Sequence, residues 1–216
     1  MYLPAHFEER RPEVLQALMQ ARPLATIVTN GAGGLAANHV PLMFLPGGPA
    51  GLGVLRGHVA RANAMWQEAQ EGTQVLAIFQ GSESYVSPSW YPTKKEHGKV
   101  VPTWNYCTVH VHGTMRAHDD AQWLRQLVGS LTDGHESVMP NPWSIDDAPE
   151  DYVRALLAQI VGIEIEITRL EGKWKVSQNQ PERNRVGAAQ GLLARSRADD
   201  AAMAQLIVEH APKVGP

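Results

Sequence analysis

The stretch LATIVTNGAGGLAANHVPLMFL, residues 24–45, decides between the two folds that this chain could most easily adopt. Residues 24–29 form a compact β-branched run, and NGAGG at 30–34 supplies turn residues, so we expect a β-hairpin that continues into residues 35–45. The glycines resemble a dinucleotide-binding loop, but such a loop opens a helix, whereas a second strand follows here. This segment therefore favours antiparallel strands.

The remaining patterns extend this antiparallel arrangement. Further strands are expected at residues 52–59, 73–80, 107–117 and 163–168. Helices are expected at residues 12–21, 62–70, 121–131, 150–161, 181–194 and 199–210. Gly162 is expected to end the helix of residues 150–161. About six strands joined mostly by hairpin-like turns predict an α+β fold around a small antiparallel barrel, because a Rossmann sheet needs a helix after every strand.

Bulk properties limit the function classes. The 216 residues carry a formal charge of −3, whereas a dedicated nucleic-acid-binding domain is usually basic. Local basic candidates are Arg10–Arg11, Lys94–Lys95 and Arg183–Arg185, each also compatible with a solvated face. The sequence has no apolar run long enough for a membrane span, no secretory signal and a single cysteine, Cys107, so we expect a cytoplasmic protein without an internal disulfide.

The segment from Tyr85 to Tyr106 matches neither helical nor strand periodicity. It concentrates aromatic and basic residues, and its prolines at 88, 92 and 102 fix φ and remove backbone donors, which predicts a stiffened loop. Flat aromatics beside cations suit a planar, anionic ligand. The alternative is a long surface loop held by aromatic anchors.

Three further clusters contain groups that could bind a ligand. GHVARAN at 57–63 lies where a strand ends and a helix begins, so free N–H groups and Arg61 could hold a phosphate; alternatively Asn63 only caps the helix and Arg61 is solvated. WKVSQN at 174–179 offers hydrogen-bond donors beside an aromatic, or else turn and cap residues. His110 and His112 share one strand face and are candidates for metal or haem, but no third ligand is near in sequence, and we expect no metal site.

The order of several long motifs resembles a known family. MYLPAHF at the start, NHVPL at 38–42, GHVARAN at 57–63, SYVSPSWYPTK at 84–94, KVVPTWNY at 99–106 and WKVSQNQ at 174–180 are similar to PaiB-type FMN-binding negative transcriptional regulators. The resemblance covers residues 1 to about 195. It implies a split β-barrel related to pyridoxamine-phosphate-oxidase, over a single domain of residues 1–216 with C-terminal helices from about 181, and a homodimer with FMN near the subunit interface.

The resemblance also implies which residues bind the cofactor. The phosphate segment corresponds to His58, Arg61 and Asn63, and Ala64 stands where the family pattern has Pro. The strand behind the flavin ring corresponds to Asn38, His39, Val40, Pro41 and Leu42. A donor to the ring edge is expected from Ser87, Trp90 or Lys94, whereas Trp104 and Tyr106 are expected to anchor the return strand. Trp174, Lys175, Ser177 and Gln178 are expected to approach from the partner chain.

Three functions follow as hypotheses. The first is an FMN-binding regulator of the PaiB type. The second is a flavin-dependent oxidoreductase that uses NAD(P)H or a small substrate, since flavin itself can supply hydride chemistry. The third is a haem-binding split-barrel protein, with His110 and His112 as the candidate ligands. Direct DNA binding is compatible with the family label but is not supported by the negative charge or by a clear helix-turn-helix pair.

Overall fold

The computed structural model describes residues 1–68 and 72–210. The chain divides into two compact units. Unit 1 contains Met1–Leu18, Gln80–Val109 and Glu171–Pro216, and unit 2 contains Met19–Phe79 and His110–Leu170. The expected single domain over residues 1–216 stays a prediction. Among the helices of the described ranges, none combines the length and the apolar character that crossing a membrane requires.

One sheet contains eight strands, in the order β3-β2-β6-β7-β8-β5-β4, with β1 paired to β8. The strands are β1 (Glu8–Glu9), β2 (Leu24–Gly31), β3 (Gly34–Pro41), β4 (Met43–Leu45), β5 (Val54–Ala60), β6 (Thr73–Val86), β7 (Thr103–His118) and β8 (Ile160–Lys175). The registers of β2 with β3, of β4 with β5 and of β5 with β8 are all antiparallel. The predicted hairpin is confirmed for residues 24–41, where Asn30 pairs with Leu35 across the β2–β3 turn, whereas residues 43–45 of the expected second strand form β4 and pair with β5.

Seven α-helices and three short 3₁₀ helices complete the described chain. The α-helices are α1 (Pro12–Ala21), α2 (Met65–Glu68), α3 (Thr93–His97), α4 (Ala121–Glu136), α5 (Glu150–Leu157), α6 (Glu182–Arg195) and α7 (Asp200–Glu209). The 3₁₀ helices are η1 (Ala5–Phe7), η2 (Pro88–Trp90) and η3 (Ile145–Asp147). The helix expected over residues 62–70 begins only at Met65, and its predicted positions 69 and 70 lie outside the described residues.

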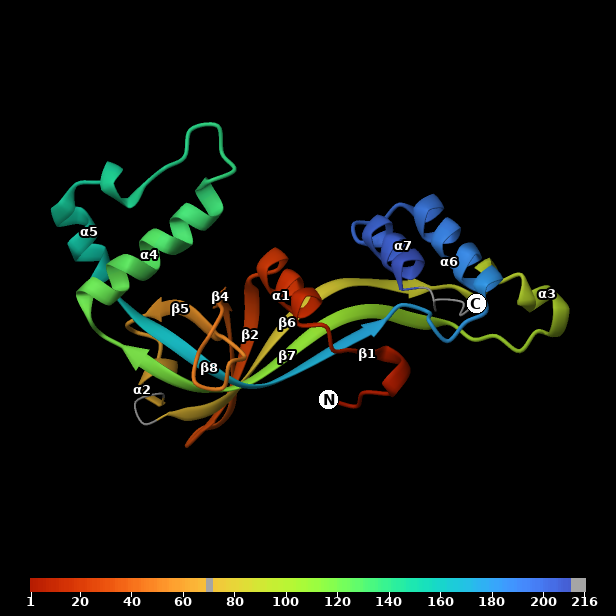
Figure 1. The fold of residues 1–216 in the computed structure, drawn as a ribbon, viewed down its shortest axis with the longest axis horizontal. Helices are drawn as coiled ribbons and strands as arrows, with labels where there is room; N and C mark the ends of the chain where they lie inside the picture. The colour runs from red at the N-terminus through yellow and green to blue at the C-terminus, as the bar shows by residue number, and fades with distance from the viewer. Residues whose placement is uncertain (69–71, 211–216) are drawn as a thin grey trace. The chain divides into compact units, whose positions relative to one another are not determined.

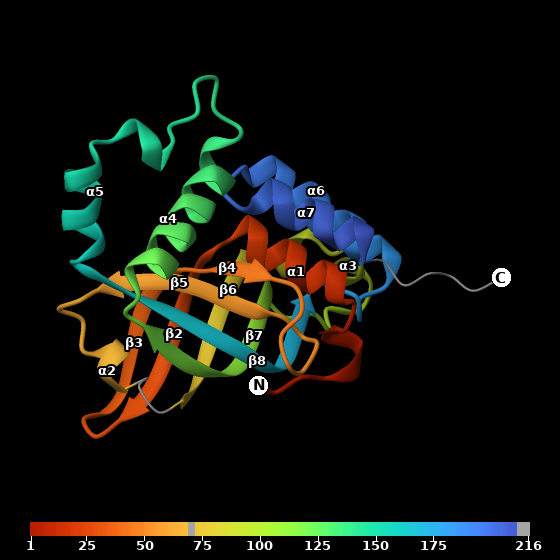
Figure 2. The ribbon, with the colours of Figure 1, turned by 60° about the vertical axis from the view of Figure 1, so that its left-hand side comes forward.

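The sheet of unit 2 curves until β5 approaches β3 (Figure 2). A Cβ atom added to Gly57 in β5 would lie 2.6 Å from the carbonyl oxygen of Pro41 and 3.3 Å from Val40. Only glycine fits such a close approach of two backbones. The inward side chains, among them Ile27, Leu55 and Ile163, are fully buried. The fold is therefore α+β, an antiparallel split β-barrel with peripheral and C-terminal helices, as predicted.

Helices α4 and α5 cover β5 and β8 on one face of the unit 2 sheet (Figure 1). Leu124 of α4 packs with Val153 and Leu157 of α5, and Trp123, Val128, Ile145, Ala148 and Ile160 surround this cluster. The spacing of these apolar residues at three and four positions places them on one face of each helix. This small core holds the two helices together.

The expectation that Gly162 ends the helix of residues 150–161 is wrong. Helix α5 ends at Leu157, and Gly162 lies inside β8, opposite His58 of β5. A Cβ atom at Gly162 would lie 2.1 Å from the ring of Trp123. The glycine is required because the indole of α4 lies directly on the strand backbone.

Several of the predicted strands were shorter than the observed ones. Strand β6 continues to Val86 and β7 begins at Thr103, so both ends of the predicted loop 85–106 belong to strands. The middle of that loop contains η2 and α3. Strand β1 was not predicted, because its two residues are too few for a recognisable alternation. The helices predicted at 181–194 and 199–210 are confirmed as α6 and α7.

In unit 1, α6 and α7 lie side by side (Figures 1 and 2) and share a buried ion pair. Asp200 accepts hydrogen bonds from Arg195 Nε at 2.8 Å, from the Arg197 backbone N–H at 3.0 Å and from the Ser84 hydroxyl at 2.8 Å. These donors, with Arg195 foremost, lower the pKa of Asp200 despite its burial. The carboxylate therefore ties both helices to the end of β6.

We expect Gly162→Ala to lower the free energy of unfolding by about 1–3 kcal/mol, because the added methyl group overpacks the Trp123 contact. Gly134→Ala is the matched control, since a Cβ atom at this position of α4 meets nothing within 4 Å. There, the better helix propensity of alanine should stabilise the protein by about 0.5–1 kcal/mol. Urea unfolding measures both changes. Equal effects of the two substitutions would contradict the close packing of Trp123 on β8.

We expect Asp200→Asn to destabilise the protein by about 3 kcal/mol at neutral pH, because it leaves Arg195 without its buried partner. The folded-state pKa of Asp200 is lowered, so its stabilisation is complete above the unfolded-state pKa of about 3.9 and is lost as pH falls further. The difference between wild type and variant should therefore shrink below about pH 4. Unfolding curves at several pH values test this. Asp133→Asn, at an exposed position of α4, should leave the pH dependence of stability unchanged. If the stability difference between wild type and Asp200→Asn did not change with pH, the lowered pKa of Asp200 would not contribute to stability.

Candidate functional site

The turn that follows β5 carries the predicted phosphate residue Arg61. Its Nη1 donates to Asp119 at 2.8 Å, and its Nη2 donates to the second carboxylate oxygen of Asp119. Its Nε donates to the Ala158 carbonyl at 2.7 Å and its Nη2 to that of Ile160 at 3.0 Å. The hydrogen bond to Asp119 raises the pKa of Arg61, and that from Arg61 lowers the pKa of Asp119. Four of the five N–H donors of Arg61 are in use within the chain, while its side chain is 37% exposed, so its phosphate role stays a prediction.

Asn63 and Asn38, both predicted site residues, are brought together. The Asn63 Nδ2 donates to Asn38 Oδ1 at 2.7 Å, and Asn63 Oδ1 accepts from the backbone N–H of Met65 at 2.9 Å. The interpretation of Asn63 as a helix cap is confirmed. Because α2 has only four residues, its macrodipole contributes little to binding an anion.

The predicted strand behind the flavin ring alternates between core and surface. Val40 and Leu42 are buried, His39 and Pro41 are exposed, and Asn38 is half-buried. Val40 and Leu42 therefore pack into the core beneath the strand. His39, Pro41 and Asn38 are the residues of this set that a ligand can reach.

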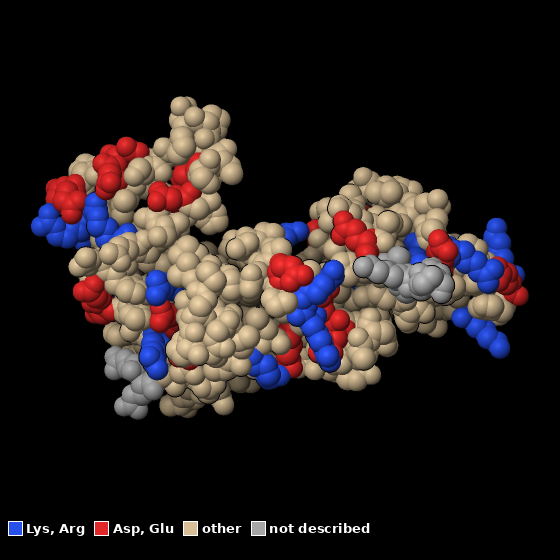
Figure 3. Space-filling model, viewed as in Figure 1, with Lys and Arg blue, Asp and Glu red and all other residues tan. Residues whose placement is uncertain are grey.

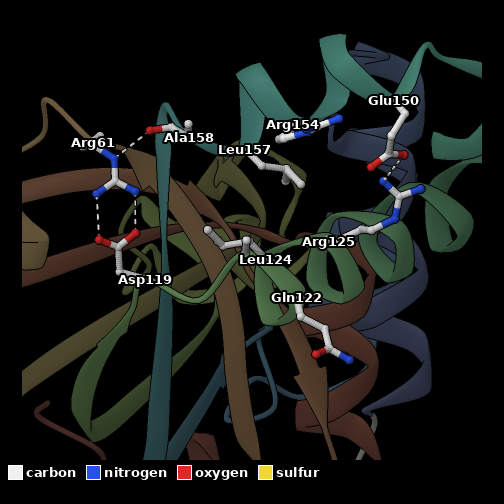
Figure 4. Close-up of a pocket in the computed structure, with 10 residues that line it drawn as sticks. Arg61, Asp119, Gln122, Leu124, Arg125, Glu150, Arg154, Leu157 and Ala158 are labelled. Carbon is white, nitrogen blue, oxygen red and sulfur yellow. Dashed lines mark hydrogen bonds and ion pairs between the residues drawn. The ribbon is translucent and has the colours of Figure 1, made fainter.

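Arg61 also lines a hollow of about 520 Å³ between the β5 turn, α4 and α5, which we call the arginine pocket (Figure 4). Its lining residues are Arg61, Asp119, Ala121, Gln122, Leu124, Arg125, Glu150, Arg154, Leu157 and Ala158. Arg125 pairs with Asp146 at 2.8 Å and with Glu150 at 3.1 Å. Within the described ranges, the guanidinium of Arg154 has no hydrogen bond or ion pair. The pocket thus combines an apolar floor with one uncompensated cation, a combination that suits an anion with an apolar part.

Sequence reasoning missed Arg125 and Arg154 as pocket residues. Both lie on helices with ordinary amphipathic spacing, where an arginine is usually solvated. The signal appears only when α4 and α5 are placed beside the β5 turn. No pattern within either helix distinguishes these two arginines from other surface residues.

His58 lies on the face of β5 that α4 and α5 cover, away from the arginine pocket's lining. Burial lowers the pKa of His58, so the imidazole is neutral at pH 7. A neutral imidazole lacks the charge that would attract a phosphate. The predicted phosphate segment is therefore divided: Arg61 lines one hollow and His58 another.

The predicted ring-edge residues of unit 1 are engaged with their own surroundings. Trp90 packs on α6 so closely that a Cβ atom at Gly191 would lie 2.2 Å from its ring, and the Arg195 guanidinium lies 5.3 Å from the ring centroid. Ser87 accepts from the Ser89 N–H at 3.2 Å as the cap of η2, and Lys94 donates to the Ser89 hydroxyl at 3.1 Å. The interpretation of the segment as a loop held by aromatic anchors is confirmed for Trp90.

Trp104 was expected to anchor the return strand, and this expectation is wrong. Its side chain is 53% exposed and meets Tyr85 edge to face at 6.1 Å between ring centroids. In a strand that is paired on both sides, alternate side chains point outward, and position 104 is on the outward face. Asn105, the next residue, is buried instead.

The 174–178 segment contains the end of β8 and the turn that follows it in unit 1. Trp174 is buried and stacks on His210, and the Gln178 amide bonds to the Trp174 carbonyl and to the Val176 N–H. Lys175 Nζ donates to Thr103 and to the Trp104 carbonyl; burial, then Lys173, lowers its pKa. The interpretation as turn residues is confirmed for Ser177 and Gln178, whereas Trp174 and Lys175 are the last two residues of β8.

Two features at Ser177 are typical of functional sites. Its φ of 66° is unusual for a residue other than glycine, and it is buried. Its hydroxyl accepts from Asn105 Nδ2 at 2.9 Å, whereas the buried Asn105 Oδ1 has no partner within the described chain. Such an unmatched acceptor can receive a hydrogen bond from a ligand or a water molecule.

Other reactive groups are constrained. Burial raises the pKa of the Cys107 thiol to about 12, which keeps it protonated and poorly nucleophilic. His112 Nε2 lies 2.9 Å from Arg169 Nη2, and no group of three potential metal ligands occurs among the residues that the structure describes.

Comparison with known proteins identifies the family of this chain. The family described as "Putative FMN-binding domain" matches residues 1–169. An uncharacterized protein of Emericella nidulans is 34% identical over 226 residues, covering 89% of this chain and 90% of its own. The Bacillus subtilis "Protease synthase and sporulation protein PAI 2" is 28% identical over 213 residues, covering 99% of each.

Solved structures share the fold at low sequence identity. The FAD and haem binding protein from Mycobacterium smegmatis superposes with a TM-score of 0.54 at 17% identity, covering 78% of this chain and 73% of its own. The flavocytochrome Anf3 from Azotobacter vinelandii gives a TM-score of 0.54 at 12% identity, covering 78% and 69%. These solved structures show the fold, whereas the family match indicates a flavin cofactor. The chain belongs to the FMN-binding-domain family, with a split β-barrel fold.

Proposed function

We propose that this chain is a homodimeric FMN-binding regulator of the PaiB type. The name of the Bacillus subtilis relative refers to protease synthesis and sporulation, which are processes under cellular control. The family match and the order of the motifs support FMN as the cofactor. The observation that carries the proposal is the exposed edge of the barrel at β3, where predicted cofactor residues and an apolar surface occur together.

The residues of unit 2 fit the two chemically different parts of FMN. Arg154 offers an uncompensated guanidinium for the phosphate, beside Arg61 and Arg125. Asn38 and Asn63 offer amide groups, and the edge of β3 offers backbone N–H and C=O groups that suit the polar edge of a flavin ring. When bound, FMN supplies hydride and electron transfer. The chain's own contribution is to bind and orient it.

The predicted residues of unit 1 complete the proposal, and those at 174–178 approach from the partner chain. Ser87, Trp90 and Lys94 form one group, and Trp174, Lys175, Ser177 and Gln178 form the other. Since Trp174 is buried and Gln178 fixes its own turn, we propose that they position this surface rather than touch the cofactor. Ser177, with the unmatched Asn105 oxygen beside it, remains the candidate for a direct polar contact.

An exposed strand supports the homodimer. β3 stands at the end of the strand order, its neighbour in that order is β2, and Leu35 is 79% exposed. A long exposed edge strand with apolar side chains is unfavourable in water, because unpaired backbone groups and apolar surface promote association. A second copy of the chain that covers this edge would pair the backbone groups and bury the apolar surface. It would also place the two cofactor sites near the interface.

The test compares Leu35→Glu with Val138→Glu. Both introduce a carboxylate at a very exposed position, 79% for Leu35 and 82% for Val138, so neither should prevent folding. We expect wild type and Val138→Glu to elute as dimers with one FMN per chain, and Leu35→Glu to elute as a monomer that loses FMN. Light scattering after size exclusion, with absorbance at 450 nm, measures both properties. A monomeric wild type, or a dimeric Leu35→Glu that retains FMN, would refute the proposal.

A helix-turn-helix mode of DNA binding finds no support in α6 and α7. Helix α7 contains no Lys or Arg and includes Asp200 and Glu209, the opposite of what a phosphate backbone requires. Lys and Arg side chains gather instead over α3 (Figure 3), where the Arg183–Glu96 ion pair at 2.7 Å joins two of the basic segments. We therefore propose that regulation acts through the flavin-bound dimer rather than through α7.

The two competing functions are less well supported. For an oxidoreductase, the sequence identified no acid or base with a defined task, and Cys107 is held as a thiol. For haem, two solved structures of this fold are described as haem or flavocytochrome proteins, but His112 faces the Arg169 guanidinium, a cation that competes with iron for the imidazole. Rapid anaerobic bleaching of the flavin by NAD(P)H would favour the oxidoreductase.

A further inference from the structure

A second hollow of unit 2, of about 410 Å³, lies over β5 and β8 beneath α4, α5 and the 137–149 segment. We call it the aromatic pocket. Its principal lining residues are His58, Val128, Trp143, Tyr152, Leu156 and Gln159. Its volume lies within the range of about 300–1,000 Å³ that is typical of small-molecule sites. The lining contains no Lys, Arg, Asp or Glu, in contrast to the arginine pocket.

His58 is the polar group at the base of this pocket. It is half-buried, and its ring nitrogens have no hydrogen-bond partner within the described parts of the chain. Burial lowers its pKa, so the ring carries one donor and one acceptor and no charge at pH 7. The half-buried imidazole can therefore form a hydrogen bond with a ligand that donates or accepts one.

The rim of the pocket exposes aromatic surface. Trp143 is 46% exposed, Tyr152 is 57% exposed and Leu156 is 46% exposed. Aromatic side chains gain most when their faces are covered by another ring, and they carry polar tips that remain in water. The exposed rings and the imidazole thus suit one ligand, a flat ring that carries a hydrogen-bonding group.

The segment that carries Trp143 is fixed before any ligand binds. The Trp143 N–H donates to Glu136 at 3.0 Å, and Ser144 with Asp147 forms a reciprocal capping box on η3. Arg125 holds Asp146 at 2.8 Å. A preformed pocket loses little entropy on binding.

We propose that the aromatic pocket binds an uncharged, planar aromatic molecule of about two rings, held between Trp143 and Tyr152 and hydrogen-bonded to His58. The absence of any charged lining residue disfavours anions and cations. The lining does not include Asn38, Asn63 or Arg154, the residues proposed for FMN, although Leu157 lines both this pocket and the arginine pocket. The aromatic pocket therefore adds a second ligand site to the proposed flavoprotein.

Two matched probes test the proposal by calorimetry. Naphthalene-2-carboxamide and 2-naphthoate share the ring system and differ in charge. We expect the wild-type protein, loaded with FMN, to bind the amide at least tenfold more tightly than the carboxylate. We expect Trp143→Ala to weaken amide binding at least tenfold. Trp104→Ala, which removes a similarly exposed indole in unit 1, should leave it unchanged.

Several results would overturn the proposal. Absence of amide binding, equal affinity for the carboxylate, or unchanged affinity in Trp143→Ala would show that the pocket is not an aromatic site. Displacement of the amide by added FMN in the cofactor-free protein would show that the pocket belongs to the flavin site. Binding that persists whether or not FMN is present supports a separate site, and this outcome does not depend on the proposed regulatory function.

Discussion

The contact between Trp123 and the backbone of β8 is the constraint on which unit 2 depends. The Trp123 indole of α4 lies on Gly162. It also stacks on His118, with 4.2 Å between ring centroids, and the Arg56 guanidinium lies 5.5 Å from the centroid of the indole. Arg56 in turn pairs with Glu164 across the β5–β8 register at 2.7 Å. Aromatic, cationic and backbone groups thus fix one helix to three strands, β5, β7 and β8. Both the arginine pocket and the aromatic pocket lie along the helices held in this way.

The polarity of the two pockets follows from the faces of α5. Val153 and Leu157 face the core beside α4, Arg154 reaches the arginine pocket, and Tyr152 and Leu156 line the aromatic pocket. Because the helix repeats every 3.6 residues, one short helix can present different chemistry on each side. An anion is favoured on one side and an uncharged ring on the other. His58 and Arg61, only three residues apart, likewise line different pockets.

The fold was more predictable from the sequence than the site. The β2–β3 hairpin, the alternation in β7 and the C-terminal helices follow from local patterns, and all are confirmed. The role of Gly162 was not predictable, since its partner Trp123 lies 39 positions away in the sequence and only the fold brings them together. The same holds for Arg61, whose partner Asp119 is 58 positions away. Side chains that complete a site across long sequence distances leave no local pattern.

The central claim is that this split barrel holds FMN, and the absorption spectrum of the purified protein, with mass identification of any released chromophore, tests it most directly. The account predicts flavin absorption bands and release of FMN in a ratio of one per chain. A colourless protein that also fails to retain added FMN after desalting would contradict it. So would a Soret band from bound haem in place of the flavin bands.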